Sequence, residues 1–294
     1  MRDELLIRLQ KTANTIRQDI IKMLVEAGSG HSAGPLGMAD IFTALYFEVL
    51  NHKPNNPKWE DRDRVVLSNG HIVPVWYATL AHAGYFPRQE MLSTLRKLNT
   101  RMQGHPHVGT TPGIENTGGP LGQGLSQAIG MALAAKFDNK KHWTYCLMSD
   151  GEQDEGQIWE AVMFAGKNKM ANLTGIMDRN NIQIDGMTED IMPLEPLKEK
   201  YEAFNWHVLE IDGHNMQQII DACAEAKAIY EKPVLILAHT IPGKGVGWME
   251  YDFRWHGMPP GIKDIPGDPK KEEQAKSALH ELRTLRGKIT GEHE

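Results

Sequence analysis

The sequence predicts an α/β protein with a parallel sheet covered by helices on both faces. Apolar runs, among them 145–148 and 173–177, alternate with segments that have helical character, the order expected for parallel strands joined by crossover helices. Polar residues follow directly on both runs, at the strand ends where such sheets bind ligands. The predicted strands cover residues 65–67, 143–148, 172–178, 205–211 and 233–239.

The helices are predicted from periodicity and from stop signals. Apolar residues from Leu9 to Leu24 recur at helical spacing and Gly28 suits the end of that helix, so residues 3–27 are expected to be helical. Residues 122–136 form a small-residue helix that can pack closely against a neighbour. The other predicted helices cover 38–49, 73–84, 155–169, 195–203 and 215–230.

Two segments lack that regular pattern. Residues 98–121 are rich in Gly, Thr and Pro, and a loop of this length inside a compact domain usually has a function. The C-terminal end is highly charged, with Leu279, Leu282 and Ile289 on one side, which indicates a solvated surface helix. We therefore expect one main domain over 1–264 and a charged helical tail over 265–294.

Composition excludes several function classes. Apolar residues make up 40% of the 294 residues and charged residues 24%, as in ordinary soluble proteins. The formal net charge of −6 implies no general attraction to nucleic acid or acidic membranes. The N-terminus lacks the apolar core of a secretory signal, and no apolar run approaches a membrane span. Cys146 and Cys223 lie in apolar contexts, so we expect buried thiols in a reducing, cytoplasmic compartment.

The stretch from Ser149 to Gly186 carries the strongest chemical signal. Asp150 follows one predicted strand and Asn180 follows the next, so both are expected at the same edge of the sheet. A carboxylate, an amide oxygen and backbone carbonyls suit Mg²⁺, with the remaining positions left for phosphate or water. The helix after Asp150 also points its N-terminus toward that spot, which suits an anion. Each of these residues, taken singly, also has a purely structural interpretation. Asp150 is then a helix N-cap and Asn180 a turn residue.

This pattern resembles the Gly-Asp-Gly…Asn-Asn signature of thiamine-diphosphate enzymes, and specifically the pyrophosphate-binding domain of the transketolase family. Five further segments match that domain, in the family's order over about residues 10–260. They are Ser29-Gly30-His31 with Gly34-Pro35-Leu36-Gly37, Leu67 to His71, Gly104-His105-Pro106, Thr117 to Gly124, and Trp255-His256-Gly257. The resemblance implies the thiamine-diphosphate-binding fold.

The sequence departs from the family pattern in two ways. Ser149 replaces the first glycine of the signature, and its small size should preserve the turn. A complete transketolase continues into a pyrimidine-binding domain and a C-terminal domain, whereas this chain stops at Glu294. The resemblance therefore implies the N-terminal subunit of a split transketolase. Its expected partner is a C-terminal subunit with the pyrimidine domain, in an α2β2 assembly with sites at the interfaces.

The resemblance also assigns cofactor and metal contacts. Asp150 and Asn180 side chains with the Ile182 carbonyl would hold Mg²⁺, or Ca²⁺ or Mn²⁺ in its place, and Asn181 remains an alternative to Asn180. Gly119 and Leu121 would contact the aminopyrimidine side of thiamine diphosphate through their backbone. Gly151 would let the chain approach the diphosphate. The alternative for the glycines between 118 and 124 is an ordinary loop that leads into the small-residue helix.

Four histidines in Gly- or Pro-flanked loops complete the expected site. By resemblance, His31 and His71 would flank the diphosphate or the donor sugar, and His71 and His256 would also contact the cofactor. His105 would bond the C1 hydroxyl of the donor, and His256 would close the site and assist proton transfer. A lone histidine is more often structural, and His105 with His107 could chelate zinc, although no cysteine or further histidine cluster suits that.

Two more features have both a plain and a functional interpretation. Glu155 is either a first-turn acid favoured by the helix dipole or, by resemblance, a buried interface glutamate that couples two cofactor sites. The glycine-rich segment 243–247, with Lys244, is either a mobile surface loop or a lid over a substrate funnel.

The expected activity is transfer of a two-carbon ketol unit from a ketose phosphate to an aldose phosphate, as in the pentose phosphate pathway. The cofactor supplies the difficult chemistry. The family's glutamate that contacts the aminopyrimidine lies in the pyrimidine domain, so we expect the chain to be inactive alone. The alternatives are the α subunit of a 2-oxo acid dehydrogenase E1 component and a catalytically silent binding module of the same fold.

Overall fold

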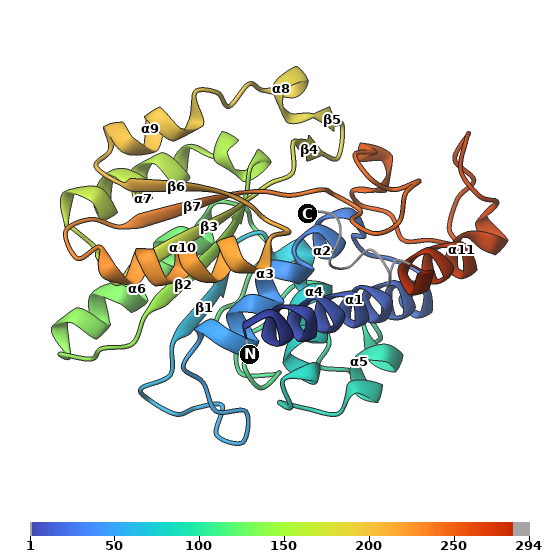
Figure 1. Ribbon diagram of the computed structural model, residues 1–294, viewed down its shortest axis with the longest axis horizontal. Coiled ribbons are helices and arrows are strands. Elements are labelled where there is room, and N and C mark those ends of the chain that lie inside the picture. The colour runs from blue at the N-terminus through green and yellow to red at the C-terminus, as the bar shows by residue number, and fades with distance from the viewer. Residues whose placement is uncertain (1, 285–294) are drawn as a thin grey trace.

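A five-stranded parallel sheet forms the centre of the molecule (Figure 1). The computed structural model describes residues 2–284. The strand order is β1-β2-β3-β7-β6, and every neighbouring pair is parallel. The strands are β1 (Arg64–Leu67), β2 (Thr144–Ser149), β3 (Leu173–Arg179), β6 (His207–Asp212) and β7 (Val234–His239). The predicted parallel sheet is confirmed, with each strand within two residues of its expected bounds.

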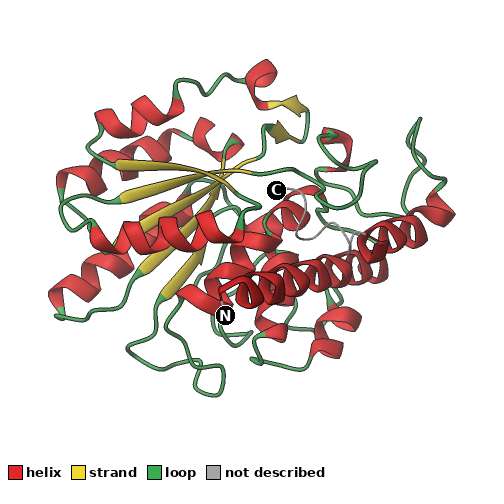
Figure 2. Ribbon diagram, in the orientation of Figure 1, coloured by secondary structure: helices red, strands yellow, loops and turns green. Residues whose placement is uncertain are grey.

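Helices cover both faces of this sheet, as predicted (Figure 2). Alternate residues of the strands supply the two cores: Tyr145 and Leu147 of β2 belong to one cluster, and Cys146 and Met148 to the other. The first cluster packs against helices of the N-terminal region and α10, and the second packs against α6, α7 and α9. These four helices are α6 (Gln123–Phe137), α7 (Gly156–Lys167), α9 (Leu197–Ala203) and α10 (Met216–Ala228).

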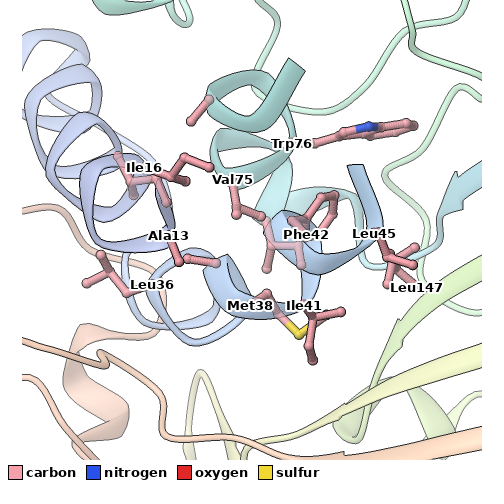
Figure 3. Packing of buried hydrophobic residues seen from close by; sticks show 14 of the residues in the cluster. Ala13, Ile16, Leu36, Met38, Ile41, Phe42, Leu45, Val75, Trp76 and Leu147 are labelled. Atoms are coloured by element: carbon pink, nitrogen blue, oxygen red, sulfur yellow. The ribbon is translucent and has the colours of Figure 1, made fainter. Parts of the chain in front are cut away.

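The N-terminal region forms a helical layer beside the sheet. Its helices are α1 (Arg2–Ala27), α2 (Ala33–Gly37), α3 (Ala39–Ala44), η1 (Leu45–Val49), η2 (Gly70–Ile72), α4 (Val73–His82) and α5 (Arg88–Thr94). Figure 3 shows how Ile16 of α1, Phe42 of α3 and Trp76 of α4 pack into one apolar core. The helix expected to begin at residue 38 is preceded by α2, and α5 was not predicted.

Short elements follow the carboxyl ends of β2 and β3, where the site was expected. They are η3 (Gly151–Asp154), the antiparallel pair β4 (Ile182–Gln183) and β5 (Gly186–Met187), and α8 (Thr188–Ile191). The loop after β7 contains η4 (Phe253–Trp255). Between α5 and α6 the chain has no helix or strand, as predicted for residues 98–121.

The charged C-terminal segment contains helix α11 (Lys271–Thr284), which lies along α1 (Figure 1). Leu282 and Ala278 are fully buried, and the side-chain amide of Asn14 in α1 donates to the Leu282 carbonyl at 2.9 Å. The predicted helix is therefore present, but its apolar side is part of the core. Ile289 lies outside the described residues, and the division of the chain at residue 264 stays a prediction.

Candidate functional site

A cavity of about 340 Å³ lies at the carboxyl edge of the sheet and contains most of the predicted site. Every predicted site residue lines it except Asn180 and Glu155. The chain brings them there from separate segments, which follow α1, β1, α5, β2, β3 and β7. The structure adds Ser149, Glu152 and residues 183–185 of the β4–β5 hairpin to the lining.

Three of the four predicted histidines form a mutual ring cluster. The ring centroids of His31 and His71 are 4.7 Å apart, and that of His256 lies 5.5 Å from His31 and 5.4 Å from His71. Burial lowers the pKa of His31 and of His256 to about 4, and it holds the pKa of His71 well below the usual value. The cluster is therefore uncharged at neutral pH, when each ring has one N–H donor and one nitrogen acceptor.

Two ring nitrogens in this cluster have no partner within the described chain. They are Nδ1 of His31 and Nδ1 of His256, and both are buried. Asn69, two residues before His71, also has an unpartnered buried amide among the described residues. Buried polar atoms normally have hydrogen-bond partners, so these groups fit a polar ligand in the cavity.

His105 lies at the same cavity but is less buried, and burial lowers its pKa to a smaller extent. Its ring is the nearest group, at 3.8 Å, to a Cβ placed on Gly119, which has a φ of +144°. A Cβ on Gly70 would lie 2.9 Å from the Gly119 nitrogen, so the two loops touch backbone to backbone. Glycine is required at these positions for close approach and for the left-handed backbone.

Asp150 is fully buried at the end of β2. Its Oδ1 accepts the Gly151 N–H at 2.7 Å, as the N-cap of η3, and its Oδ2 accepts the Asn181 N–H at 2.6 Å. Burial raises the pKa of Asp150 to about 6, against the lowering effect of these donors and of Arg179. The N-cap alternative is thus realised. Oδ1 keeps a lone pair for a further ligand, whereas Oδ2 also accepts a hydrogen bond from Arg179 at 3.2 Å.

Asn180 is buried beside Asp150 but does not line the cavity. Its Oδ1 accepts the Ile182 N–H at 3.0 Å, and its amide donates to Asp178 at 2.8 Å, so the turn alternative is also realised. Asn181 has a left-handed φ of +64°. No group of three or more His, Cys, Asp or Glu side chains suited to a metal occurs in the described residues. The metal ligands therefore stay predictions.

Arg179 is a site residue that sequence reasoning missed. Its guanidinium is 4% exposed and bonds Asp150 at 3.2 Å, Glu189 at 2.7 Å and Glu195 at 2.9 Å. The signal was a cation at the last position of a buried strand, where a charge requires carboxylate partners. It connects the predicted metal carboxylate to the segment after β5.

The predictions for Glu155 and for the segment 243–247 both concern features that the structure does not test. Glu155 is exposed in this chain, so any burial of its carboxylate requires another chain, and its interface role stays a prediction. The segment 243–247 is anchored by bonds from Gly243 N to Ala33 O, Gly245 N to Glu250 and Gly247 N to Glu281. Whether it moves as a lid remains a hypothesis.

Known proteins are similar in sequence to most of this chain. A family model described as the thiamine diphosphate binding domain of transketolase matches residues 8–273. The chain is 46% identical to the 6-deoxy-6-sulfo-D-fructose transketolase subunit SqwG of Clostridium sp. (strain MSTE9), covering 86% of this chain and 91% of that protein. It is 42% identical to one of the subunits of the apulose-4-phosphate transketolase of Phocaeicola vulgatus, covering 86% and 89%.

Longer proteins match over part of their length. The chain is 40% identical to transketolase 2 of Escherichia coli, covering 86% of this chain but 39% of that protein. The solved transketolase of Campylobacter jejuni superimposes with a TM-score of 0.82 at 35% identity, covering 96% of this chain and 47% of that one. None of the described helices is both long and apolar enough to cross a membrane.

Proposed function

Because this chain belongs to the transketolase family, we propose that it is the N-terminal subunit of a two-chain transketolase that uses thiamine diphosphate and Mg²⁺. The enzyme transfers a two-carbon ketol unit from a ketose phosphate to an aldose phosphate. The observation that carries this proposal is the meeting of His31, His71 and His256 with buried Asp150 in one cavity at the carboxyl edge of the sheet.

The residues in the cavity fit thiamine diphosphate. Unpartnered Nδ1 atoms of His31 and His256 supply polar groups for the ligand. Gly151 lines the cavity, and a Cβ there would make only ordinary contacts, the nearest at 3.6 Å to Gln183, so no atom of the described chain crowds this stretch of backbone. Asp150, Asn180 and the Ile182 carbonyl are oxygen donors of the kind that Mg²⁺ prefers. When bound, the cofactor supplies the electron sink for carbon–carbon bond cleavage.

The neutral histidines define what the chain itself contributes. An uncharged imidazole donates one hydrogen bond and accepts another, so His31 and His71 orient hydroxyl or phosphate oxygens without a fixed charge. His256 is 9% exposed and stands where it can exchange a proton with a substrate hydroxyl. His105, beside Gly119, positions the end of the donor that reacts.

Support for a second subunit comes from the relatives of similar length. The chain spans about nine tenths of two proteins whose names call them transketolase subunits, but only 39% of a single-chain transketolase. The proposed partner carries the pyrimidine-binding domain and completes the site in an α2β2 assembly. The names of those relatives also specify 6-deoxy-6-sulfo-D-fructose and apulose 4-phosphate, so a specialised donor fits the proposal.

Reconstitution tests the proposal. The tagged chain is isolated from its native cells, the chain that co-purifies is identified, and the purified pair is assayed for ketol transfer with and without thiamine diphosphate, Mg²⁺ and each subunit. We expect transfer only when all four are present. Robust transfer by the isolated chain would refute the need for a partner.

The same assay separates the alternatives. Turnover of a 2-oxo acid with an electron acceptor, without turnover of ketose phosphates, would favour a 2-oxo acid dehydrogenase E1 α subunit. Cofactor binding by the complete pair without any turnover would favour a silent binding module. Measured activity with a panel of sulfonated and phosphorylated ketoses would identify the donor.

A further inference from the structure

Glu152 is a fully buried carboxylate in the wall of the cavity, and neither the motifs nor the family signature singled it out. Its Oε1 accepts hydrogen bonds from the Ser68 hydroxyl and from the Gly122 N–H, the latter at 2.6 Å. Its Oε2 accepts the Ser149 N–H at 3.1 Å. One side chain therefore holds three separate segments of the chain.

Each of those segments carries residues of the proposed site. Ser68 begins the loop that contains His71, Gly122 follows Leu121, and Ser149 precedes Asp150. Two of the sequence separations are large, since Ser68 lies 84 positions from Glu152 and Gly122 lies 30 positions away, whereas Ser149 lies three positions away. A single carboxylate thus sets the relative positions of the strand ends of β1 and β2 and of the loop before α6.

Ser68 extends the same network to the start of α6. Its hydroxyl oxygen accepts the Gly124 N–H at 3.0 Å while its proton goes to Glu152. Glu152 and Ser68 together satisfy the Gly122 and Gly124 N–H groups at the positive end of a 15-residue helix. The first turn of α6 is therefore already occupied by an internal anion.

Burial of the Glu152 carboxylate without a cationic partner costs free energy, and this cost argues for a role beyond packing. No ion pair joins Glu152 to any other residue within 2–284, so its charge is held by neutral donors alone. Burial of such a group disfavours the charged form, and burial does raise the pKa of Glu152. Loss of the carboxylate would leave the Gly122 and Ser149 N–H groups buried without an acceptor.

We propose that Glu152 is a positioning residue that holds the loops of His71, Leu121 and Asp150 in the arrangement that binds thiamine diphosphate. That the ligand is thiamine diphosphate rests on the proposed function. The arrangement of the loops rests on the hydrogen bonds alone. Glu155, three residues further along the chain, is exposed and does not belong to the hydrogen-bond network of Glu152.

Two variants test the proposal, with Glu231→Gln as a matched control at an exposed site far along the chain. Glu152→Gln keeps the shape of the side chain but places an amide N–H₂ against one of its N–H or O–H donors. Ser68→Ala removes the hydroxyl that joins Glu152 to α6. Both are compared with the wild-type chain, in complex with its partner, by hydrogen–deuterium exchange and by titration with thiamine diphosphate at saturating Mg²⁺.

For Glu152→Gln we expect amide exchange at least ~10-fold faster in residues 68–71, 119–124 and 149–151, with unchanged exchange in β7 and an unchanged melting temperature within a few degrees. The dissociation constant for thiamine diphosphate should rise at least ~10-fold. Ser68→Ala should show a smaller increase in amide exchange in the same loops. If Glu152→Gln does not fold, the exchange of Ser68→Ala tests the proposal in its place. Glu231→Gln should match the wild type.

Unchanged exchange in the three loops would overturn the proposal, as would faster exchange spread evenly over the sheet, which would indicate a general loss of stability. Faster exchange in the loops with unchanged cofactor affinity would also overturn it. A wild-type complex that binds no thiamine diphosphate, while Glu152→Gln still loosens the three loops, would refute the proposed function and leave the positioning of the loops established.

Discussion

The Arg179 guanidinium lies 3.2 Å from Oδ2 of Asp150, and both side chains are almost completely buried. The same Asp150 oxygen accepts the Asn181 N–H, so a fixed positive charge and a backbone dipole converge on the proposed metal carboxylate. Arg179 also reaches Glu189 and Glu195, which are partly exposed. The carboxylate is therefore held in place before any metal arrives.

Replacement of Arg179 by Met should lower the free energy of unfolding by about 3 kcal/mol, because it leaves Asp150 buried without its cation. The double variant Arg179→Met with Asp150→Asn should be less destabilised than Arg179→Met alone, since a neutral amide does not require a cation. Urea unfolding of the chain without cofactor measures both. A loss in the double variant equal to the sum of the losses in Arg179→Met and in Asp150→Asn, each measured singly, would show that the pair does not interact.

Replacement of Asp150 by Ala should abolish Mg²⁺-dependent binding of thiamine diphosphate, with a dissociation constant raised at least ~100-fold. The reason is the loss of the one carboxylate among the proposed ligands. Isothermal titration with and without Mg²⁺ makes the measurement, and Asp221→Ala, at an exposed ion pair with Arg2, is the control. Undiminished binding by Asp150→Ala would contradict the metal assignment.

The stability of the chain should fall as pH decreases from about 6.5 to about 4. The pKa of His256 is lowered from 6.5 to about 4 by burial, so the unfolded chain binds more protons than the folded chain between those values. The contribution is about 3 kcal/mol at full titration. It is fully present above the unfolded pKa and lost as pH falls to the folded one.

Thermal melting of the His256→Asn variant across this pH range makes the measurement. The variant should show a flatter pH dependence than the wild type, whereas His280→Asn, at an exposed position of α11, should not. Equal slopes in His256→Asn and the wild type would mean that the ring is not neutral in the folded state.

The sheet could be predicted because burial on both faces requires apolar strands, and Tyr145 to Met148 show this without help from other parts of the chain. The start of the helix predicted from residue 38 could not, because α2 precedes it. Residues 34–37, Gly-Pro-Leu-Gly, have the composition of a loop, yet Pro35 lies in the first turn of α2, where its missing N–H is not needed. Tertiary packing of Leu36 decided the outcome.

For the site residues too, those that stand in short sequence motifs could be predicted, and those defined by contacts between distant segments could not. Asp150 and His71 stand in contiguous motifs, so their presence at the cavity could be predicted. Glu152 and Arg179 could not be assigned, because their partners Ser68 and Glu195 are set by folding and not by any spacing in the sequence. By resemblance the sequence pointed to Glu155, whose interface role stays a prediction, and only the structure shows that Glu152 is buried.

A matched pair of glycines on α6 tests whether close packing sets the site. A Cβ on Gly124 would lie 2.4 Å from the Ser68 Cβ and 2.5 Å from its Cα, so Gly124→Ala must displace the loop that leads to His71. We expect Gly124→Ala to lower the free energy of unfolding by about 2 kcal/mol and to weaken cofactor binding. On the same helix, a methyl group on Gly130 would meet no atom within 4 Å, so Gly130→Ala should raise stability by about 0.5–1 kcal/mol through its helix propensity. Urea unfolding of both variants of the isolated chain makes the comparison, and equal effects at the two positions would show that the contact between α6 and Ser68 does not constrain the site.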